Sequence, residues 1–314
     1  MEAASVPEAT PPTKPARNGG VSDRAKSERK LAYMLCAPAV IVMLIVTGYP
    51  IAYAFYLSLQ KFDLRFPDDK EFVGLSNYGD VLSSSTWWSD VGTTLIITVA
   101  SVSIELVLGM AIALVMHRAI FGRGAVRASV LIPYGIVTVV AAFAWRYAFD
   151  PTSGFVQSLP LISDSWAPFN QRDSSLLVIV LTEVWKTTPF MALLLLAGLA
   201  LVPDELHEAA KVDGANAVQR FYRITLPLMK PAILVALLFR TLDAFRVFDT
   251  VFIQTAGANG TETVSILGYN VLINRVNLGL GSAISILIFI AVILIATFFV
   301  KVLGTSTAQQ RGEA

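Results

Sequence analysis

Six long apolar runs, separated by polar stretches, make up most of the chain. A helix needs about 20 apolar residues to cross a bilayer. The runs cover 31–57, 91–116, 128–149, 175–201, 231–254 and 280–303. Pro50, Pro133 and Pro189 fall inside or near them, which membrane helices tolerate when neighbours satisfy the freed carbonyl groups. The pattern predicts an all-α membrane protein with six transmembrane helices.

Composition supports this class and excludes several kinds of site. Of 314 residues, 55% are apolar and 15% are charged, whereas soluble domains carry about a quarter charged residues. The net charge of +1 indicates no bulk nucleic-acid partner. The single cysteine, Cys36, forms no intrachain disulfide, and His117 and His207 belong to no metal-ligand pattern. No P-loop motif occurs, so the chain is expected to bind no nucleotide or metal cofactor.

The distribution of Lys and Arg predicts the orientation in the membrane, because short cytoplasmic flanks carry an excess of both. They gather before the first run, after the second and after the fourth, at Lys14, Arg17, Arg24, Lys26, Arg29, Lys30, Arg118, Arg123, Arg127, Lys211, Arg220, Arg223 and Lys230. The loops 150–174 and 255–279 hold only Arg172 and Arg275. We therefore expect a disordered cytoplasmic tail at 1–30, a six-span domain at 31–304 and a cytoplasmic tail at 305–314.

A short polar segment, LHEAAKVDGANAVQRFYRITLP at 206–227, interrupts the apolar pattern on the predicted cytoplasmic side. Pro203 and the acids after it predict a helix start, and Gly214 predicts a break or a left-handed turn. A second short helix is expected at 215–223. From the physics alone, the segment has two interpretations: an amphipathic connector on the membrane surface, or a surface of small residues that another protein approaches closely.

The spacing of these residues resembles the EAA motif of ABC-importer permeases. The match consists of Glu208-Ala209-Ala210, three further residues, Gly214-Ala215, then Phe221, Ile224, Leu226-Pro227 and Pro231. The segments FVGLSNY at 72–78, WRYAFDPTSG at 145–154 and FRTLDAFRVFDTVFIQT at 239–255 resemble sugar permeases of the maltose-type carbohydrate group. Within that group the chain most resembles the first permeases of actinobacterial trehalose importers. AGAN at 256–259 departs from the usual pattern and leaves the shape of loop 255–279 open.

The resemblance implies a type I ABC importer permease fold with a cytoplasmic coupling helix in the loop 203–230. It implies that the coupling residues are Glu208, Ala209, Ala210, Asp213, Gly214, Ala215, Phe221, Leu226 and Pro227. Glu208 would pair with a basic residue of the ATPase or cap the local turn. The implied partners are a second permease, two copies of a cytoplasmic ATPase that binds ATP and Mg²⁺, and an extracytoplasmic sugar-binding lipoprotein. The chain would be a transport subunit and not an enzyme, for trehalose or for another solute such as glycerol phosphate or another oligosaccharide.

Several ionisable residues lie inside the predicted spans, where each costs about 2.5–3.5 kcal/mol on insertion scales. Glu105 is near the centre of the second span. Glu183 and Lys186 share one helix face and are expected to neutralise each other. Arg240, Asp243, Arg246 and Asp249 alternate in sign at a spacing of three and predict a slanted stripe on the fifth span.

Glu183 and Arg246 lie at similar depths from the outer side, which predicts a polar layer that lines a water-filled cavity. The alternative is a set of structural ion pairs, and Arg240 is the residue that fits it best. WKTTPF at 185–190 resembles the turn that borders the sugar site in maltose-type permeases. The candidate pathway residues are Glu183, Lys186, Thr187, Phe190, Asp243, Phe245, Arg246 and Asp249. Which of the two permeases holds the sugar is left open.

Two other classes of protein compete with the importer permease. A secondary transporter would use Glu105 and Glu183 as proton carriers. An intramembrane enzyme would need a Ser/His, HExxH or paired-Asp motif, and the sequence contains none at a usable spacing.

Overall fold

The computed structural model describes residues 23–118, 123–156 and 166–311, which fall into two units, Met1–Tyr53 and Ala54–Ala314. The first unit is helical from α1 (Asp23–Met43) through a π-helix (Leu44–Gly48) into α2 (Tyr49–Ser58). Helix α1 thus begins inside the segment 1–30 that we expected to be disordered, and that prediction is wrong for residues 23–30. Residues 1–22 lie outside the described part, so their disorder stays a prediction.

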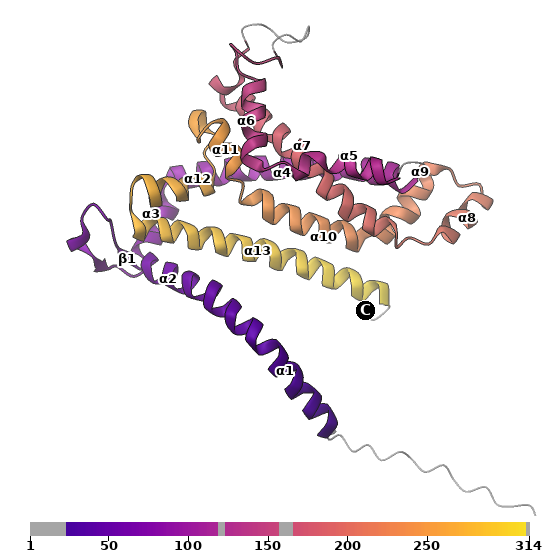
Figure 1. Ribbon diagram of the computed structural model, residues 1–314, viewed down its shortest axis with the longest axis horizontal. Helices are drawn as coiled ribbons and strands as arrows, with labels where there is room; N and C mark the ends of the chain where they lie inside the picture. Colours follow the sequence, from indigo (N-terminus) through magenta and orange to yellow (C-terminus); the bar gives the residue numbers. More distant parts are fainter. Residues whose placement is uncertain (1–22, 119–122, 157–165, 312–314) are drawn as a thin grey trace, which may run out of the picture. The chain divides into compact units, whose positions relative to one another are not determined.

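The second unit consists of helices and one short hairpin. Strands β1 (Gln60–Lys61) and β2 (Glu71–Phe72) pair antiparallel, with Gln60 opposite Phe72. The helices are α3 (Ser76–Ser83), α4 (Ser85–Arg118), α5 (Arg123–Gly135), α6 (Thr138–Ala148), α7 (Arg172–Leu199), α8 (Asp204–Val212), α9 (Ala217–Arg220), α10 (Leu226–Phe245), α11 (Asp249–Gln254), α12 (Val264–Tyr269) and α13 (Leu278–Arg311). Short 3₁₀-helices cover Pro67–Asp69, Pro168–Asn170 and Ala258–Gly260, and π-helices cover Phe221–Thr225 and Asn270–Asn274. Within this unit, α8 and α9 lie at the opposite end of the long helices from α3, α11 and α12 (Figure 1).

Five helices of the described chain are long and apolar enough to cross a membrane: Lys30–Ser58, Ser85–His117, Arg172–Leu199, Ala217–Gln254 and Leu278–Val302. The predicted third span, 128–149, is not a single helix. It divides into α5 and α6, which are bent by 90°. The count reaches the expected six when this bent pair is taken as one span, and helix α13 continues to Arg311 through the predicted tail.

The bend in the third span follows from its local sequence. Pro133 lies inside α5 and has no N–H to donate, and Gly135 ends the helix. Ile136 and Val137 are non-helical, and the N–H of Ile136 reaches the carbonyl oxygen of Pro133 at 3.3 Å. Ile136 lies between the two helices in sequence, and its carbonyl oxygen accepts a hydrogen bond from a side chain of α7.

The fifth span also differs from the prediction. The expected second helix of the polar loop, 215–223, does not end there, since α9 passes through Phe221–Thr225 directly into α10. At the other end, α10 stops at Phe245, and Arg246 to Phe248 separate it from α11. The predicted stripe at a spacing of three is therefore broken between Asp243 and Asp249. The shape of the loop 255–279, which the sequence left undecided, is partly helical, because α12 and the π-helix after it cover residues 264–274 and bury side chains such as Ile266.

Helices α4, α7 and α10 contact one another around an apolar core of fully or nearly fully buried side chains, among them Ala113, Met191, Leu195, Met229 and Ala236. Close approach of α7 and α10 depends on Gly198, because a Cβ at that position would overlap the side chain of Ala232. Small residues bring membrane helices close together because packing, rather than hydrophobic burial, drives their association in lipid.

The segment 72–78 joins the hairpin to the end of α2 through side-chain hydrogen bonds. The amide of Asn77 is buried and donates to the carbonyl oxygens of Ser58 at 2.8 Å and Gln60 at 2.9 Å. The hydroxyls of Tyr78 and Ser58 lie 2.6 Å apart. Since the carbonyl of Ser58, the last residue of α2, has no partner within the helix, the bond from Asn77 satisfies a group that would otherwise be orphaned.

A turn held by one carboxylate ends the third span. The side chain of Asp150 accepts hydrogen bonds from the Thr152 hydroxyl and N–H and from the N–H and hydroxyl of Ser153. The bond from the Thr152 hydroxyl contributes most, and together they hold the pKa of Asp150 below its ordinary value. These bonds give a structural reason for the residues Asp150, Thr152 and Ser153 in the segment 145–154.

Replacing Asn77 by Leu should destabilise the chain, because the buried carbonyls of Ser58 and Gln60 both lose their side-chain donor. We expect the free energy of unfolding to fall by about 1–3 kcal/mol, seen as a lower Tm of the detergent-solubilised protein. Asn274→Leu is the matched control, since its amide makes an exposed bond to Asn270 and should cost about 0.5 kcal/mol or less. Equal Tm values for the two variants would contradict the role of Asn77.

Candidate functional site

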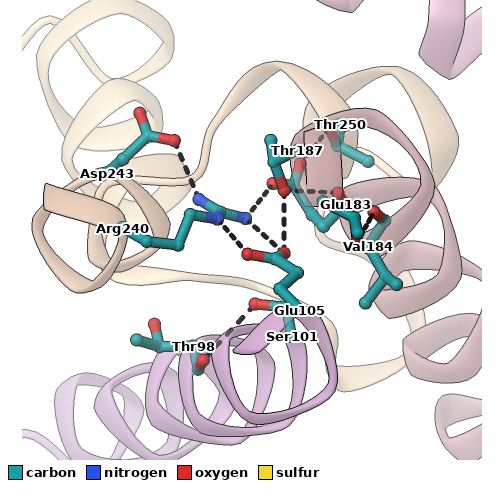
Figure 2. Close-up of polar contacts among 10 residues, drawn as sticks. Thr98, Ser101, Glu105, Glu183, Val184, Thr187, Arg240, Asp243 and Thr250 are labelled. Atoms are coloured by element: carbon teal, nitrogen blue, oxygen red, sulfur yellow. Dashed lines mark hydrogen bonds and ion pairs between the residues drawn. The ribbon is translucent and has the colours of Figure 1, made fainter. Parts of the chain in front are cut away.

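A buried ion cluster joins three spans at the level of the predicted polar layer. Arg240 on α10 is 1% exposed, and its guanidinium contacts Glu105 on α4 and Glu183 on α7. Nε lies 2.5 Å from Glu105 Oε2, and Nη2 lies 3.0 Å from Glu105 Oε1 and 2.9 Å from Glu183 Oε2. Figure 2 shows the guanidinium facing the carboxylates of Glu105 and Glu183, with Asp243 on its other side. One cation thus binds carboxylates from α4, α7 and its own helix.

Hydroxyl groups complete the cluster. Thr187 donates to Glu105 Oε1 at 2.8 Å, and Thr250 on α11 donates to Glu183 Oε1 at 2.5 Å. Asp243 Oδ2 accepts from Arg240 Nη1 at 2.8 Å, although 68% of the Asp243 side chain is exposed. A buried charge is tolerated only when it is paired and hydrogen-bonded. Every carboxylate oxygen of Glu105 and Glu183 has such a partner.

A cavity of about 520 Å³ lies directly beside this cluster. Its lining residues come from the α5–α6 bend, from α7 and from the break between α10 and α11: Tyr134, Ile136, Val137, Thr138, Glu183, Lys186, Thr187, Asp243, Arg246, Val247, Phe248, Asp249 and Thr250. Three carboxylates and two cationic side chains are among them. Its volume is in the range of about 300–1,000 Å³ that is typical of small-molecule sites.

Six of the eight predicted pathway residues line this cavity, so the prediction of a polar layer shared by the fourth and fifth spans is confirmed. The other two, Phe190 and Phe245, do not. Phe190 stacks on Tyr134 with ring centroids 5.4 Å apart and so supports the wall from behind. Phe245 is buried in an apolar cluster with Trp87 and Val264, away from the cavity.

The predicted neutralisation of Glu183 by Lys186 is wrong. Glu183 binds Arg240 and Thr250, whereas Lys186 Nζ donates to the Ile136 carbonyl at 3.0 Å and lies 5.6 Å from the centroid of the Tyr134 ring. The 90° bend that frees the Ile136 carbonyl provides this partner. Lys186 therefore remains a cation on the cavity wall.

Sequence reasoning missed the contribution of the third span to the cavity, which includes Tyr134, Ile136 and Thr138. The sequence signal for this contribution is Pro133 followed by Gly135 in the middle of an apolar run, a pair that indicates a break in the helix of the third span. It also missed Phe248, whose ring lies 5.3 Å from that of Tyr269 and gives the cavity a second aromatic face. The sequence favoured a structural role for Arg240, and Arg240 lies behind the residues that line the cavity and is not one of them.

The predicted coupling segment forms a separate exposed surface. No residue of α8 is buried, and Glu208, Ala209, Asp213 and Gly214 are exposed. Gly214 adopts a φ of +80°, the left-handed conformation that the sequence predicted. Asn216 and Gln219 then form a capping box that starts α9. Within the part of the chain that the structure describes, the Glu208 carboxylate has no hydrogen-bond or ion-pair partner, so it does not cap the turn.

The remaining coupling residues anchor this surface to the membrane helices. Ala210 and Ala215 are half-buried, and the Ala215 N–H donates to the Ala210 carbonyl at 2.8 Å across the turn. Phe221 packs against the apolar core of α4, α7 and α10. Leu226 and Pro227 open α10 rather than ending a helix before it. The exposed segment α8 is thereby connected through α9 and α10 to Arg240.

Comparison with known proteins gives consistent results. A family model described as "Binding-protein-dependent transport system inner membrane component" matches residues 82–309. The chain is 56% identical over 280 residues to "Trehalose transport system permease protein SugA" of Mycobacterium tuberculosis (strain ATCC 25618 / H37Rv), covering 89% of this chain and 91% of that protein. It is 42% identical over 281 residues to "Trehalose/maltose transport system permease protein MalF" of Thermococcus litoralis, covering 88% and 94%.

Among solved structures, the chain is similar to one from a crystal structure of a bacterial ABC transporter involved in the import of the acidic polysaccharide alginate. The TM-score is 0.75 at 21% sequence identity, covering 90% of this chain and 98% of that chain. The similarity confirms the predicted type I importer permease fold.

Arg240→Met should destabilise the protein strongly, because it leaves Glu105 and Glu183 buried without their cation. We expect a loss of about 3–5 kcal/mol in the free energy of unfolding, measured as a fall in Tm in mild detergent. The double variant Glu105→Gln/Arg240→Met should lose less than Arg240→Met alone, because one uncompensated charge is gone.

Arg246→Met is the matched control for Arg240→Met, since Arg246 is an exposed arginine of the same span. Its Tm should stay close to that of the wild type. If Arg240→Met is as stable as Arg246→Met, the cluster does not hold the three helices together.

Proposed function

The chain belongs to the family of binding-protein-dependent transport system inner membrane components, and we propose that it forms half of the sugar pathway of an ATP-driven importer, for trehalose or a similar disaccharide. It is a multi-pass membrane protein and a transport component rather than an enzyme. The observation that carries the proposal is the charged cavity at the α5–α6 bend, beside the Arg240 cluster. The relatives named for trehalose transport support the choice of substrate.

The lining of the cavity suits a polyhydroxylated solute. Carboxylates of Glu183, Asp243 and Asp249 accept hydrogen bonds from sugar hydroxyls, and Lys186 and Arg246 donate to them. The rings of Tyr134 and Phe248 offer apolar faces for the C–H surface of a pyranose. Carboxylates outnumber cations in this lining, which disfavours an anionic solute such as glycerol phosphate.

We propose that α8 docks on a cytoplasmic ATPase, with Glu208 paired to a basic residue of that subunit. A second permease completes the pathway, and two ATPase copies bind the ATP and Mg²⁺. An extracytoplasmic sugar-binding lipoprotein delivers the substrate, and both termini face the cytoplasm. Movement of α8 passes through α9 and the unbroken helical path into α10, and Arg240 transmits it to α4 and α7. The three helices then move as one body when the ATPase closes.

The competing secondary transporter is disfavoured by the same cluster. Proton carriers must exchange protons with the two sides of the membrane, whereas Glu105 is fully buried and both Glu105 and Glu183 are bound to Arg240. The energy for transport is therefore assigned to the partner ATPase.

Lys186→Ala should impair transport more than assembly, because it removes a hydrogen-bond donor from the cavity wall. In proteoliposomes with the complete importer, we expect the KM for trehalose uptake to rise about tenfold or more, the loss of one charged hydrogen bond. Co-purification with the other subunits should be unchanged. Lys301→Ala, at the far end of α13, is the control. Wild-type uptake kinetics in Lys186→Ala would show that Lys186 does not contact the substrate.

Gly214→Trp should abolish association with the ATPase while leaving the chain in the membrane. Among the described residues, nothing lies within 4 Å of a Cβ built on Gly214, so a side chain there starts in open space, where we expect the bulk of Trp to obstruct a docked partner. Gly214→Ala is the matched control, because it carries the same left-handed strain of about 1–2 kcal/mol without the bulk. Pull-down of the ATPase should succeed with Ala and fail with Trp. Recovery of the ATPase with both variants would refute docking at this turn.

A further inference from the structure

Two adjoining cavities lie beside α8, at the end of the long helices away from α3 and α12. The first, of about 500 Å³, is lined by basic side chains from three helices: His117 of α4, His207 and Lys211 of α8, and Arg220 of α9. Among the described residues of its lining, Asp204 is the acidic one. The chain contains only two histidines, and both are here although they are far apart in sequence.

The chemistry of the first cavity fits an anion. Lys211 and Arg220 are cationic side chains, and Asp204 is the acidic side chain that opposes them among the described lining residues. Arg220 uses one N–H to bind the Ala215 carbonyl at 2.9 Å, which fixes the guanidinium and leaves further donors for a ligand. His207 and the Thr225 hydroxyl, 3.5 Å apart, add two more polar groups. A phosphate group, with several acceptor oxygens, is the ligand that such a set of donors binds best.

The second cavity, of about 450 Å³, is largely apolar and adjoins the first. It shares Leu114, His207, Arg220 and Thr225 with the basic cavity. The rest of its lining is Val115, Ala217, Val218, Phe221 and Tyr222. Val115, Val218 and Tyr222 are each more than 60% exposed. A free phosphate ion makes no favourable contact with this apolar wall. A phospholipid carries both a phosphate for the basic cavity and an acyl chain for the apolar one.

We propose that these two adjoining cavities bind one anionic phospholipid of the inner leaflet. Its phosphate lies among His117, Lys211 and Arg220, and an acyl chain lies along Val115, Val218 and Tyr222. Basic pockets at the cytoplasmic ends of membrane helices are suited to lipid headgroups. The lipid contacts α4, α8 and α9 at once and so holds the coupling helix against the membrane helices. The inference rests on the proposed function for its orientation and for the role of α8.

Native mass spectrometry of the complete importer, purified in mild detergent with added phosphatidylglycerol, tests the site. We expect the wild type to retain one phosphatidylglycerol per chain, and not phosphatidylcholine. Lys211→Gln should weaken its affinity about fivefold, the effect of one cation near the headgroup, and Lys211→Gln/His117→Gln should weaken it further. Lys230→Gln removes the same charge at the same end but outside both cavities, and it should retain the lipid. Equal retention by the Lys211 and Lys230 variants would overturn the proposal.

A second variant separates the lipid from a soluble phosphate. Val218→Asp places a charge on the exposed apolar wall and should expel the lipid without altering the basic cavity. Inorganic phosphate or glycerophosphoglycerol should not compete at millimolar concentration. Displacement of the lipid by either compound, or normal retention by Val218→Asp, would refute the lipid assignment. Because lipid binding is measured without transport, an importer that fails to take up sugar but keeps the lipid would refute the proposed function alone.

Discussion

The structure depends on one guanidinium that is shared by carboxylates from different helices. Arg240 binds Glu105, Glu183 and Asp243, and removing it would leave two buried anions unpaired in the membrane. Inside lipid, no hydrophobic force draws helices together, so packing and polar contacts must do it. The cluster therefore fixes the relative positions of α4, α7 and α10 in a way that their apolar surfaces alone do not.

The same cluster places the cavity. Glu183 and Asp243 each contact Arg240 and also line the cavity, so their orientation follows from the ion pairs behind them. Breaks in two spans complete the site. The α5–α6 bend supplies the Ile136 carbonyl that holds Lys186, and the α10–α11 break supplies Arg246 and Asp249. Irregular backbone is tolerated at membrane depth only where it is buried in protein or lines a polar cavity, and both breaks satisfy that condition.

Much of this organisation was predictable from the sequence, because it depends on local pattern. Apolar length predicted the spans, Gly214 predicted the left-handed turn, and charges at similar depth predicted a shared polar layer. Features that depend on contacts between helices were not predictable. Spacing on one helix paired Glu183 with Lys186, whereas the true partner, Arg240, lies on another helix. The prediction of Phe245 as a pathway residue failed for the same reason. Periodicity shows which residues share a helix face but not which element packs against that face, and Phe245 faces an apolar cluster instead of the cavity.

We propose that energy enters this chain through α8 and not through its buried carboxylates, which Arg240 holds in place. Uptake of labelled trehalose into proteoliposomes under two driving forces tests this most directly. We expect the complete importer to accumulate trehalose when ATP is on the ATPase side and the binding protein on the other side. The purified chain alone should accumulate none under a proton gradient. Accumulation by the chain alone, driven by the proton gradient, would contradict this proposal.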